Sequence, residues 1–444
     1  MTSVTNNNII KLYKYESLLY FFLWTGAVLY SIYKVFLINT YFINYDDLYG
    51  DFAPGWTWIG RKQDVSDEEW RMWIPLIIKL IPWLFLHHII NHFIKISSNC
   101  MLLCFSYIFI SLLFLYYSIG ILGTLCALIH PSILYILTYK RSRSIIWMIN
   151  NFLYKLAYCL YLPTLSLGPL ILYYEFIDSV KKTSQSLKIA DLRNFLFNVI
   201  RYIFWIFFAN FFLHFLYFNA IQYHPEFVKS LDPWTLYGLG YCMGQFFLIK
   251  YVVVYGLTHT LCAIDNIKAP PQPKCVARIH LYSDMWKYFD QGLYKFLIRY
   301  IYVPLLKSNF NKLFASFLCF TFVFLWHGMQ TNIFIWTFLN FIGLNVESLI
   351  KSTGKNKYYL SIRKKYLSET NARRFHCILT SPLLAMSVIS NFYFFVGEEI
   401  GNIYIYRILH DTGYSTFTLL FFLYCCCQVS TDIKNWELQK YSKL

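Results

Sequence analysis

Residues 284–328 read DMWKYFDQGLYKFLIRYIYVPLLKSNFNKLFASFLCFTFVFLWHG, and this stretch decides how the rest of the sequence is interpreted. Its apolar part, Leu313 to Trp326, is preceded by Asp290 and followed by His327-Gly328. Ionisable groups at the edge of a bilayer or inside it are costly, so each is a functional candidate by default. The stretch therefore predicts a site built from a carboxylate and an imidazole, with the remaining chain as its housing.

The composition excludes an ordinary soluble protein. The chain of 444 residues is 57% hydrophobic and 21% aromatic, and only 14% of its residues are charged. Apolar runs of about 20 residues, the length that crosses a hydrocarbon core, recur throughout. We predict one all-α polytopic membrane domain over residues 1–444, with about ten to twelve transmembrane helices plus re-entrant segments.

The net charge of +16 is distributed as in a membrane protein. Lys and Arg gather in short loops between the apolar runs, which is the positive-inside pattern. A nucleic-acid-binding protein would need a contiguous basic face on a soluble module, so we expect no nucleic-acid partner. The loop charges predict that residues 39–73 are lumenal and that four segments are cytosolic: 1–16, 268–307, 351–374 and 431–444.

Two segments have interrupted apolar patterns. The portion from Trp286 to Pro304 is too apolar for a loop and too short to cross with its charges, so we interpret it as re-entrant. Residues 145–177 are broken by Pro163 and Gly168-Pro169, and two tilted or re-entrant pieces explain them better than one helix. Broken backbone at membrane depth survives only where it is buried in protein or lines a cavity.

Two groups of potential ligand residues have structural alternatives. His88 and His92 share a helix face and could bind a metal, but no Glu follows His88 as in zincin motifs. Interfacial histidines are therefore the favoured interpretation of His87, His88 and His92. The 12 cysteines have neither disulfide spacing nor a C-x-x-C zinc site. Residues 425–427, all Cys, are either S-acylated or packed in the last span, and packing is favoured.

His327 and Asp290 each have a functional and a structural interpretation. An imidazole with a pKa near neutrality can remove a proton from an amine or hydroxyl, although His327 could simply cap a helix end at the interface. Asp290 could pair with Lys287 or Arg299. The surrounding cations could instead hold the phosphates of a donor that enters from the cytosol. The residues predict a membrane enzyme that moves a group between two sides, without identifying the group.

Several further motifs occur along the chain in a recognisable order. They are Gly60-Arg61-Lys62-Gln63-Asp64 with Glu69-Trp70, Gly168-Pro169 with Glu175-Phe176, Pro270-Pro271-Gln272-Pro273-Lys274-Cys275, Met285-Trp286-Lys287-Tyr288-Phe289-Asp290, the run FLIRYIYVP at 296–304, Trp326-His327-Gly328 and Ser390-Asn391-Phe392. With these motifs the chain resembles the membrane-bound O-acyltransferases. The most similar branch is the Hedgehog acyltransferase (Rasp) branch of protein-cysteine N-palmitoyltransferases.

The resemblance implies a fold with a central tunnel. It also implies transfer of palmitate from palmitoyl-CoA to the N-terminal cysteine amine of a secreted Hedgehog-type ligand. The expected location is the endoplasmic reticulum membrane, with the Golgi as the alternative and membrane lipid as the surroundings. Carried over by position, His327 and Asp290 are catalytic. The residues expected to bind acyl-CoA are Trp286, Lys287, Arg299, Trp326 and Asn391. Cys275 falls where this branch binds a haem iron through a thiolate.

The sequence departs from the branch at two positions, and two other functions stay open. Lys287 stands where Arg is common, and Lys lacks the bidentate fork of Arg. Met329 follows Gly328 where a second glycine is common. One alternative is a Gup-type acyltransferase that acts on a lipid or glycolipid anchor. The other is a non-catalytic regulator of the same branch, against which the presence of His327 argues.

Overall fold

The computed structural model describes residues 12–44, 50–96, 99–137, 145–166, 168–182, 189–411 and 413–441. Parts of three predicted regions therefore lie outside the described residues. They are residues 1–11 of the cytosolic N-terminus, Asp46 and Asp47 of the lumenal loop, and residues 442–444 of the tail.

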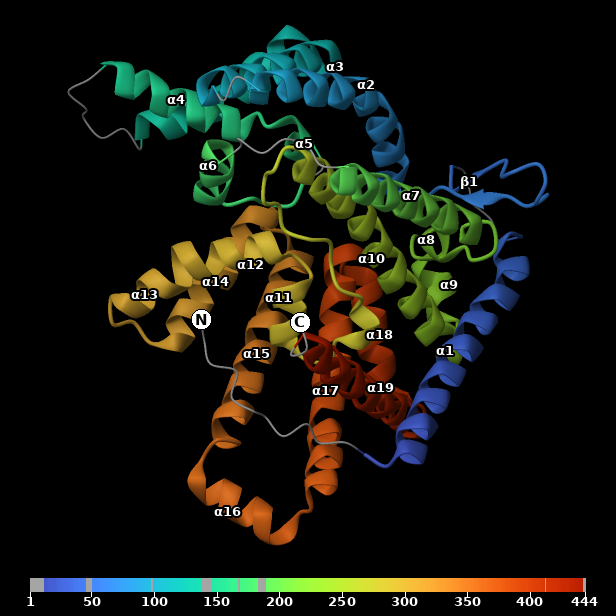
Figure 1. Ribbon diagram of the computed structural model, residues 1–444. Coiled ribbons are helices and arrows are strands. Elements are labelled where there is room, and N and C mark those ends of the chain that lie inside the picture. Colours follow the sequence, from blue (N-terminus) through green and yellow to red (C-terminus); the bar gives the residue numbers. More distant parts are fainter. Residues whose placement is uncertain are drawn as a thin grey trace.

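The described fold is built from helices, as the composition predicts (Figure 1). Eight of the described helices are long and apolar enough to cross a membrane. They are α1 (Lys14–Phe42), α2 (Glu68–Ile96), α3 (Cys100–Leu137), α7 (Ile189–Phe212), α10 (Pro233–Ile264), α15 (Thr331–Thr353), α17 (Glu369–Phe395) and α19 (Gly413–Tyr441). The all-α polytopic class is confirmed.

Short elements connect the long helices. They are α4 (Ile145–Cys159), α5 (Leu162–Leu165), α6 (Tyr173–Lys181), α8 (Phe218–Ile221), α9 (Pro225–Lys229), the 3-10 turn η1 (Val276–Arg278), α11 (Tyr282–Tyr288), α12 (Gln291–Leu297), the π-helical turn η2 (Ile298–Tyr302), α13 (Val303–Lys307), α14 (Lys312–His327), α16 (Lys357–Tyr366) and α18 (Glu398–His410). The strands β1 (Phe52–Ala53) and β2 (Gln63–Asp64) form one antiparallel pair.

The segments with interrupted patterns are broken into short pieces. Residues 145–177 contain α4, α5 and the start of α6, and residues 286–304 run through α11, α12, η2 and the start of α13. The apolar pattern predicts separate spans at 101–119 and 120–139, and α3 joins the described part of both as two helical pieces that meet at Gly120, where the backbone is non-helical with φ 71°. This joining is one reason why the described long helices are fewer than the predicted crossings.

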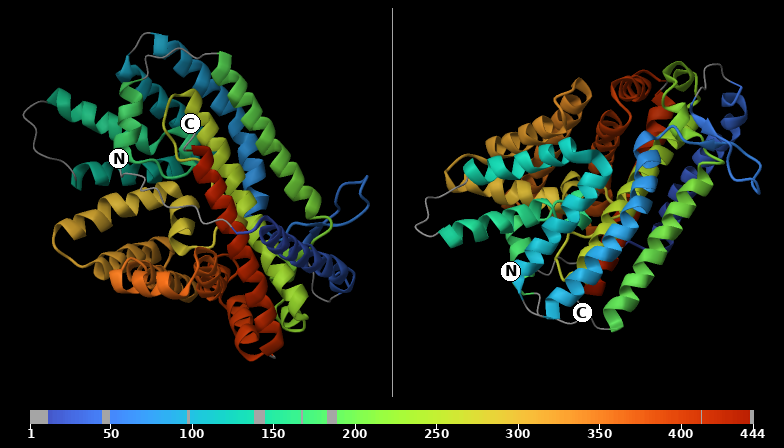
Figure 2. Two further views of the ribbon diagram at one scale, coloured as in Figure 1. Left: turned by 60° about the horizontal axis from the view of Figure 1, so that its bottom comes forward. Right: turned by 90° about the horizontal axis from the view of Figure 1, so that it is seen from above.

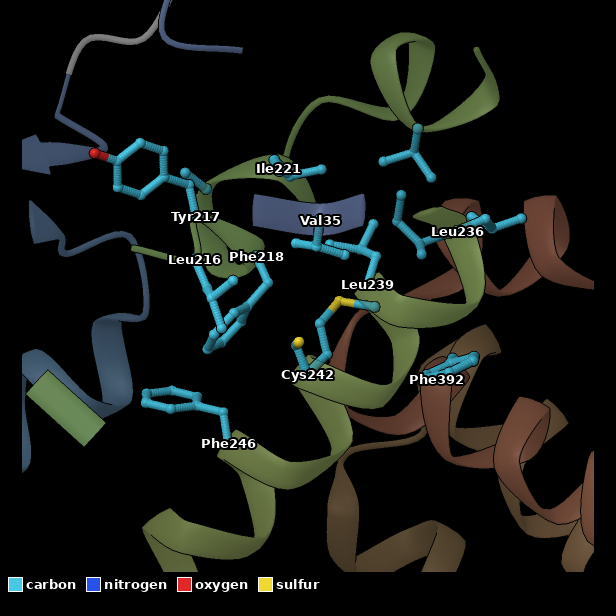
Figure 3. Packing of buried hydrophobic residues seen from close by; sticks show 14 of the residues in the cluster. Val35, Leu216, Tyr217, Phe218, Ile221, Leu236, Leu239, Cys242, Phe246 and Phe392 are labelled. Carbon is cyan, nitrogen blue, oxygen red and sulfur yellow. The ribbon is translucent and has the colours of Figure 1, made fainter. Parts of the chain in front are cut away.

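Helix α10 lies at the centre of the bundle. It packs against α1 on one side and α7 on another (Figure 2). The largest buried cluster gathers around it, and Figure 3 shows Leu239 of α10 beside Val35 and Phe246 of α10 on the side of Phe218. Half of the residues in the most apolar 18-residue stretch of α10 are buried, so this helix belongs to the core of the bundle.

The predicted lumenal segment is tied to the bundle by buried charges. Asp64 accepts hydrogen bonds from the backbone N–H groups of Asn219 and Ala220, both at 3.0 Å. Lys250 of α10 is buried and forms ion pairs with Asp67 at 2.9 Å and Glu69 at 2.8 Å. The segment is therefore a fixed part of the structure next to α10.

A second group of ion pairs, called here the ion-pair belt, connects α1, α17, α19 and α11 to one another. Glu16 of α1 pairs with Arg374 of α17, Arg373 of α17 pairs with Asp432 of α19, and Lys434 of α19 pairs with Asp284 of α11, each at 2.6 Å. The four helices have regions that sequence analysis predicts to be cytosolic. The belt therefore marks the end of the bundle that we expect at the cytosolic face.

Candidate functional site

A cavity of about 380 Å³ lies between α10, the α11–α12 segment, the end of α14, α15 and α17. Both residues singled out by the sequence, Asp290 and His327, line this cavity. Most of the remaining wall is aromatic or aliphatic, with a few polar side chains among them. A largely apolar cavity with a small number of convergent polar groups is typical of a small-molecule site.

Asp290 is held by two donors. It is the N-cap of α12, where Oδ1 accepts from the backbone N–H of Leu293 at 2.9 Å. Its Oδ2 accepts from the hydroxyl of Tyr255 on α10 at 3.1 Å. Burial raises the pKa of the Asp290 carboxyl, whereas the bonds from Leu293 and Tyr255 lower it. The sequence alternative, a pair with Lys287 or Arg299, is wrong, because those side chains contact Tyr288 and Tyr174 instead.

A close backbone approach fixes the start of α12. A Cβ on Gly292 would lie 2.1 Å from the carbonyl oxygen of Leu170, so only glycine fits here. The same region is tied to α6 by an ion pair of Lys295 with Glu175 at 3.2 Å. The guanidinium of Arg299 lies 3.6 Å from the ring centre of Tyr174. Leu170 and the start of α6 therefore support the element that carries Asp290.

His327 ends α14, and Gly328 follows it with a left-handed φ of 111°. This conformation is usual for a glycine that terminates a helix. The imidazole meets the rings of Trp336 and Phe394 edge to face, with centroids 5.3 and 5.1 Å away. The aromatic contacts fix the ring plane at the cavity wall.

A set of indole and amide groups orders the wall between α11, α15 and α17. Trp286 Nε1 donates to Asn340 Oδ1 at 3.0 Å, and Trp336 Nε1 donates to Asn391 Oδ1 at 3.2 Å. The two indoles also stack, with centroids 5.7 Å apart. Because Trp336 contacts both Asn391 and His327, it connects the amide to the imidazole.

The structure places the other predicted acyl-CoA residues in two groups. Trp286, Trp326 and Asn391 line the cavity together with Asp290 and His327. Lys287 and Arg299 lie outside its lining and are occupied in cation–π contacts. The contact of Lys287 and Arg299 with a donor phosphate stays a prediction.

Cys275 does not mark a haem pocket in the described part of the chain. Its thiol is exposed, which suits an iron ligand, but the residue lines neither described cavity. Its neighbours Val276 and Ala277 line the apolar cavity that contains Asp290 and His327. Nothing in the described residues supports a haem at Cys275, so we derive no step through one. Residues 425–427 are buried, as the packing interpretation predicts.

Sequence analysis missed four residues of the site. Tyr251, Tyr255, Trp336 and Asn340 all line the cavity but lie in segments interpreted only as spans. Asn340 carried a usable signal, since a buried amide in an apolar helix needs a partner. The two tyrosines carried a weaker one, because a spacing of four residues places them on the same face of α10.

The interfacial interpretation of His87 is wrong, because its side chain is fully buried. His87 Nε2 lies 2.9 Å from Asp265 Oδ2, and His88 Nδ1 lies 3.3 Å from Asp265 Oδ1. These three residues have the ligand types of a metal site. However, Lys95 Nζ lies 3.3 Å from the same Asp265 carboxylate and already balances its charge.

The second nitrogen of His87 also argues against a metal. Its Nδ1 is buried and has no hydrogen-bond partner among the described residues. A metal on Nε2 would force a proton onto this unpartnered atom, whereas ligating histidines normally donate their second N–H. The cluster is better explained as a buried ion pair of Lys95 with Asp265, to which the two imidazoles add hydrogen bonds.

Comparison with known proteins identifies the family. The family model for the membrane-bound O-acyltransferases matches residues 86–390, which include Asp290 and His327. The chain belongs to this family. Among relatives, Rasp, the protein-cysteine N-palmitoyltransferase of Drosophila melanogaster, is 36% identical over 281 residues, covering 62% of this chain and 55% of Rasp.

Other relatives come from the same and from neighbouring branches. HHAT, the protein-cysteine N-palmitoyltransferase of Mus musculus, is 30% identical over 284 residues, covering 63% of this chain and 57% of HHAT. The HHAT-like protein of Mus musculus is 23% identical over 441 residues, covering 85% of this chain and 86% of that protein. Fungal Gup membrane-bound O-acyltransferases also match. The matches to Rasp and HHAT span about half of those proteins.

Proposed function

We propose that this membrane protein transfers palmitate from palmitoyl-CoA to the N-terminal cysteine amine of a secreted Hedgehog-type ligand. The observation that carries the proposal is the shared cavity of Asp290 and His327, which come from separate segments. The similarity to Rasp and HHAT, both named protein-cysteine N-palmitoyltransferases, supports the choice of acyl donor and acceptor. We propose the endoplasmic reticulum membrane as the location, because secreted ligands pass through it.

In the proposed reaction the ligand amine attacks the thioester carbonyl of palmitoyl-CoA. A C–N bond forms, the C–S bond breaks, and the CoA thiolate leaves. His327 accepts the proton that the amine must lose. The α-amino group has a pKa near 8, so a base of modest strength is sufficient. The proton can then pass to the departing thiolate, which completes the balance.

The aromatic wall has a defined role in this scheme. Trp336 and Phe394 restrict the orientation of the His327 ring, so that its nitrogen points to one place in the cavity. The apolar lining favours an acyl chain over water, and exclusion of water protects the thioester from hydrolysis. Asn391 is the candidate donor to the carbonyl oxygen as negative charge develops there.

Asp290 acts as a second catalytic residue in the proposal. Its carboxylate lies at the start of α12 with both oxygens already accepting one hydrogen bond. Each carboxylate oxygen has a further lone pair, so Asp290 can still orient a substrate N–H. The bonds from Leu293 and Tyr255 hold the carboxylate in place before the substrate arrives.

The direct test uses purified full-length protein, labelled palmitoyl-CoA and a peptide that begins with the N-terminal Cys of the ligand. Label in an amide on the peptide supports the proposal. An otherwise identical peptide with an acetylated N-terminus is the control, because it has no free amine. Label on the acetylated peptide would point to the cysteine thiol and contradict amine transfer.

The same assay separates the two alternatives. A Gup-type acyltransferase would place label on lipid and none on the peptide, and the similarity to fungal Gup proteins favours keeping this arm. A non-catalytic regulator would label neither. The haem predicted from the resemblance has its own test, since a Soret band in the purified protein that is lost in Cys275→Ala would support it.

A further inference from the structure

Helix α16 has a surface that the proposed reaction does not use. It connects α15 and α17 and crosses between their ends, away from the rest of the bundle (Figure 1). None of its residues is buried. Tyr358, Ile362 and Tyr366 are 77%, 40% and 70% exposed, and their spacing of four residues places them along one face.

The exposed face is bordered by cations. Lys365 lies next to the exposed face, Arg363 lies on its other side in an ion pair with Glu369 at 2.7 Å, Lys357 and Lys364 lie on the opposite face, and Lys355 lies in the turn before α16. Around a helix with 100° per residue, Lys365 lies on one side of the Tyr358–Tyr366 stripe and Arg363 lies on the other. A helix with aromatic and aliphatic residues on one face and Lys and Arg beside them is typical of a membrane surface.

Short connections keep α16 close to the bundle. Three residues, 354–356, link it to α15, and two residues, 367 and 368, link it to α17. An extended chain reaches at most about 3.5 Å per residue, so α16 lies within about 10 Å of the helices that it joins. It cannot move far from the plane where α15 and α17 end.

The ion-pair belt locates that plane. Arg373 and Arg374 of the belt lie within the second turn of α17, just after α16. Lys351, near the end of α15, pairs with Glu347 and donates to Ser283, which neighbours Asp284 of the belt. Since charged side chains collect where the hydrocarbon ends, α16 lies about one to two turns beyond that boundary, at headgroup depth.

We propose that α16 binds the anionic phospholipid headgroups of the adjacent leaflet. The Lys and Arg side chains attract the phosphates, and Tyr358, Ile362 and Tyr366 insert among the headgroups. An amphipathic aromatic side chain is suited to that depth. A soluble polyphosphate would use the cations but would leave the aromatic stripe in water, which is why we commit to lipid.

Binding at α16 would also steady the cavity wall. Its neighbours α15 and α17 carry Trp336 and Asn391, which form the 3.2 Å hydrogen bond beside His327. A lipid that fixes the connection between the two helices restricts their relative motion. The proposal does not depend on which acceptor the protein acylates.

The experiment is hydrogen–deuterium exchange of the full-length protein in nanodiscs, followed for residues 355–368. We compare discs of phosphatidylcholine alone with discs that contain about one third phosphatidylserine. Anionic lipid should slow exchange in α16 several-fold, since the negative surface potential of the leaflet attracts the basic residues of the helix. Equal exchange in the two kinds of disc would overturn the proposal.

Matched variants distinguish the remaining explanations. The double variant Lys364→Glu, Lys365→Glu should lose the response to phosphatidylserine, whereas Lys312→Glu, at an exposed lysine outside α16, should keep it. A response that survives the double variant contradicts binding at α16. Slower exchange on adding CoA to neutral discs would assign the cations to a soluble phosphate donor and equally contradict the proposal.

Discussion

The hydroxyl of Tyr255 donates a 3.1 Å hydrogen bond to Oδ2 of Asp290, across the cavity wall between α10 and the start of α12. Tyr251 lies one turn earlier, with its ring 5.3 Å from that of Tyr255 and 5.6 Å from that of Phe289. These contacts hold the Tyr255 ring in position, so the hydroxyl is directed at the carboxylate. Tyr255 is therefore a positioning residue for Asp290.

Loss of this hydroxyl should reduce turnover more than substrate affinity. A hydrogen bond to a charged group contributes about 1.5–3 kcal/mol, so Tyr255→Phe should lower kcat roughly 10- to 100-fold with little change in KM. The pKa of Asp290 should also rise, because the bond from Tyr255 lowers it. The acidic limb of the pH profile of kcat should then move to higher pH.

Kinetics with Tyr251→Phe provide the control for this prediction. Tyr251 lines the same cavity and packs on Tyr255, but its hydroxyl makes no recorded bond to Asp290 within the described residues. Its variant should keep the position of the acidic limb. A wild-type pH profile in Tyr255→Phe would show that the hydroxyl does not act on Asp290.

Replacement of His327 tests the proposed base. General-base catalysis typically contributes roughly 10²–10⁴-fold, so His327→Ala should lose that much of the amide-forming rate. Binding of a non-hydrolysable palmitoyl-CoA analogue should change far less, because the ring contributes only part of an extensive apolar wall. Loss of both rate and binding together would indicate that His327 shapes the cavity instead.

Gly292→Ala should destabilise the segment that carries Asp290. The new Cβ would approach the Leu170 carbonyl to 2.1 Å, and backbone atoms cannot move away as a side chain end can. We expect a lower midpoint of thermal unfolding in detergent and a lower kcat. Gly26→Ala in α1 is the matched control, because its Cβ would meet nothing within 4 Å. Equal midpoints for the two variants would contradict the close approach.

The sequence predicted the helical class because apolar runs and basic loops are local patterns. It also singled out Asp290 and His327, since ionisable groups are rare in apolar segments. Their shared cavity was expected from the resemblance to a known family, and the structure adds the wall that joins them. Trp336 and Asn340 could not be placed in advance, because an interior aromatic or amide on α15 acquires its role only from its partners on α11 and α17.

The histidines at 87 and 88 illustrate the limit of local patterns. Their position near the end of an apolar run is equally compatible with an interface and with burial. Asp265, which pairs with both, lies 178 residues from His87 in the sequence. No spacing rule connects residues so far apart, so the buried cluster required the fold.

Lys250→Met should destabilise the protein by releasing Asp67 and Glu69, where the predicted lumenal loop meets the start of α2. The Lys250 ammonium is buried and pairs with both carboxylates, and removal of one member of a buried pair typically costs about 3–5 kcal/mol. The cost should fall below that range, since Glu69 is partly exposed and can regain water. Thermal unfolding in detergent should therefore show a clear decrease in the midpoint.

Lys229→Met is the matched control, because its pair with Glu226 is exposed and the midpoint should hardly change. Limited proteolysis gives a second readout: cleavage within residues 50–67 should become faster only in the Lys250 variant, because only that pair fastens the loop to α10. If cleavage in this loop stayed at the wild-type rate while the midpoint fell, Lys250 would stabilise α10 by packing and not by holding the loop.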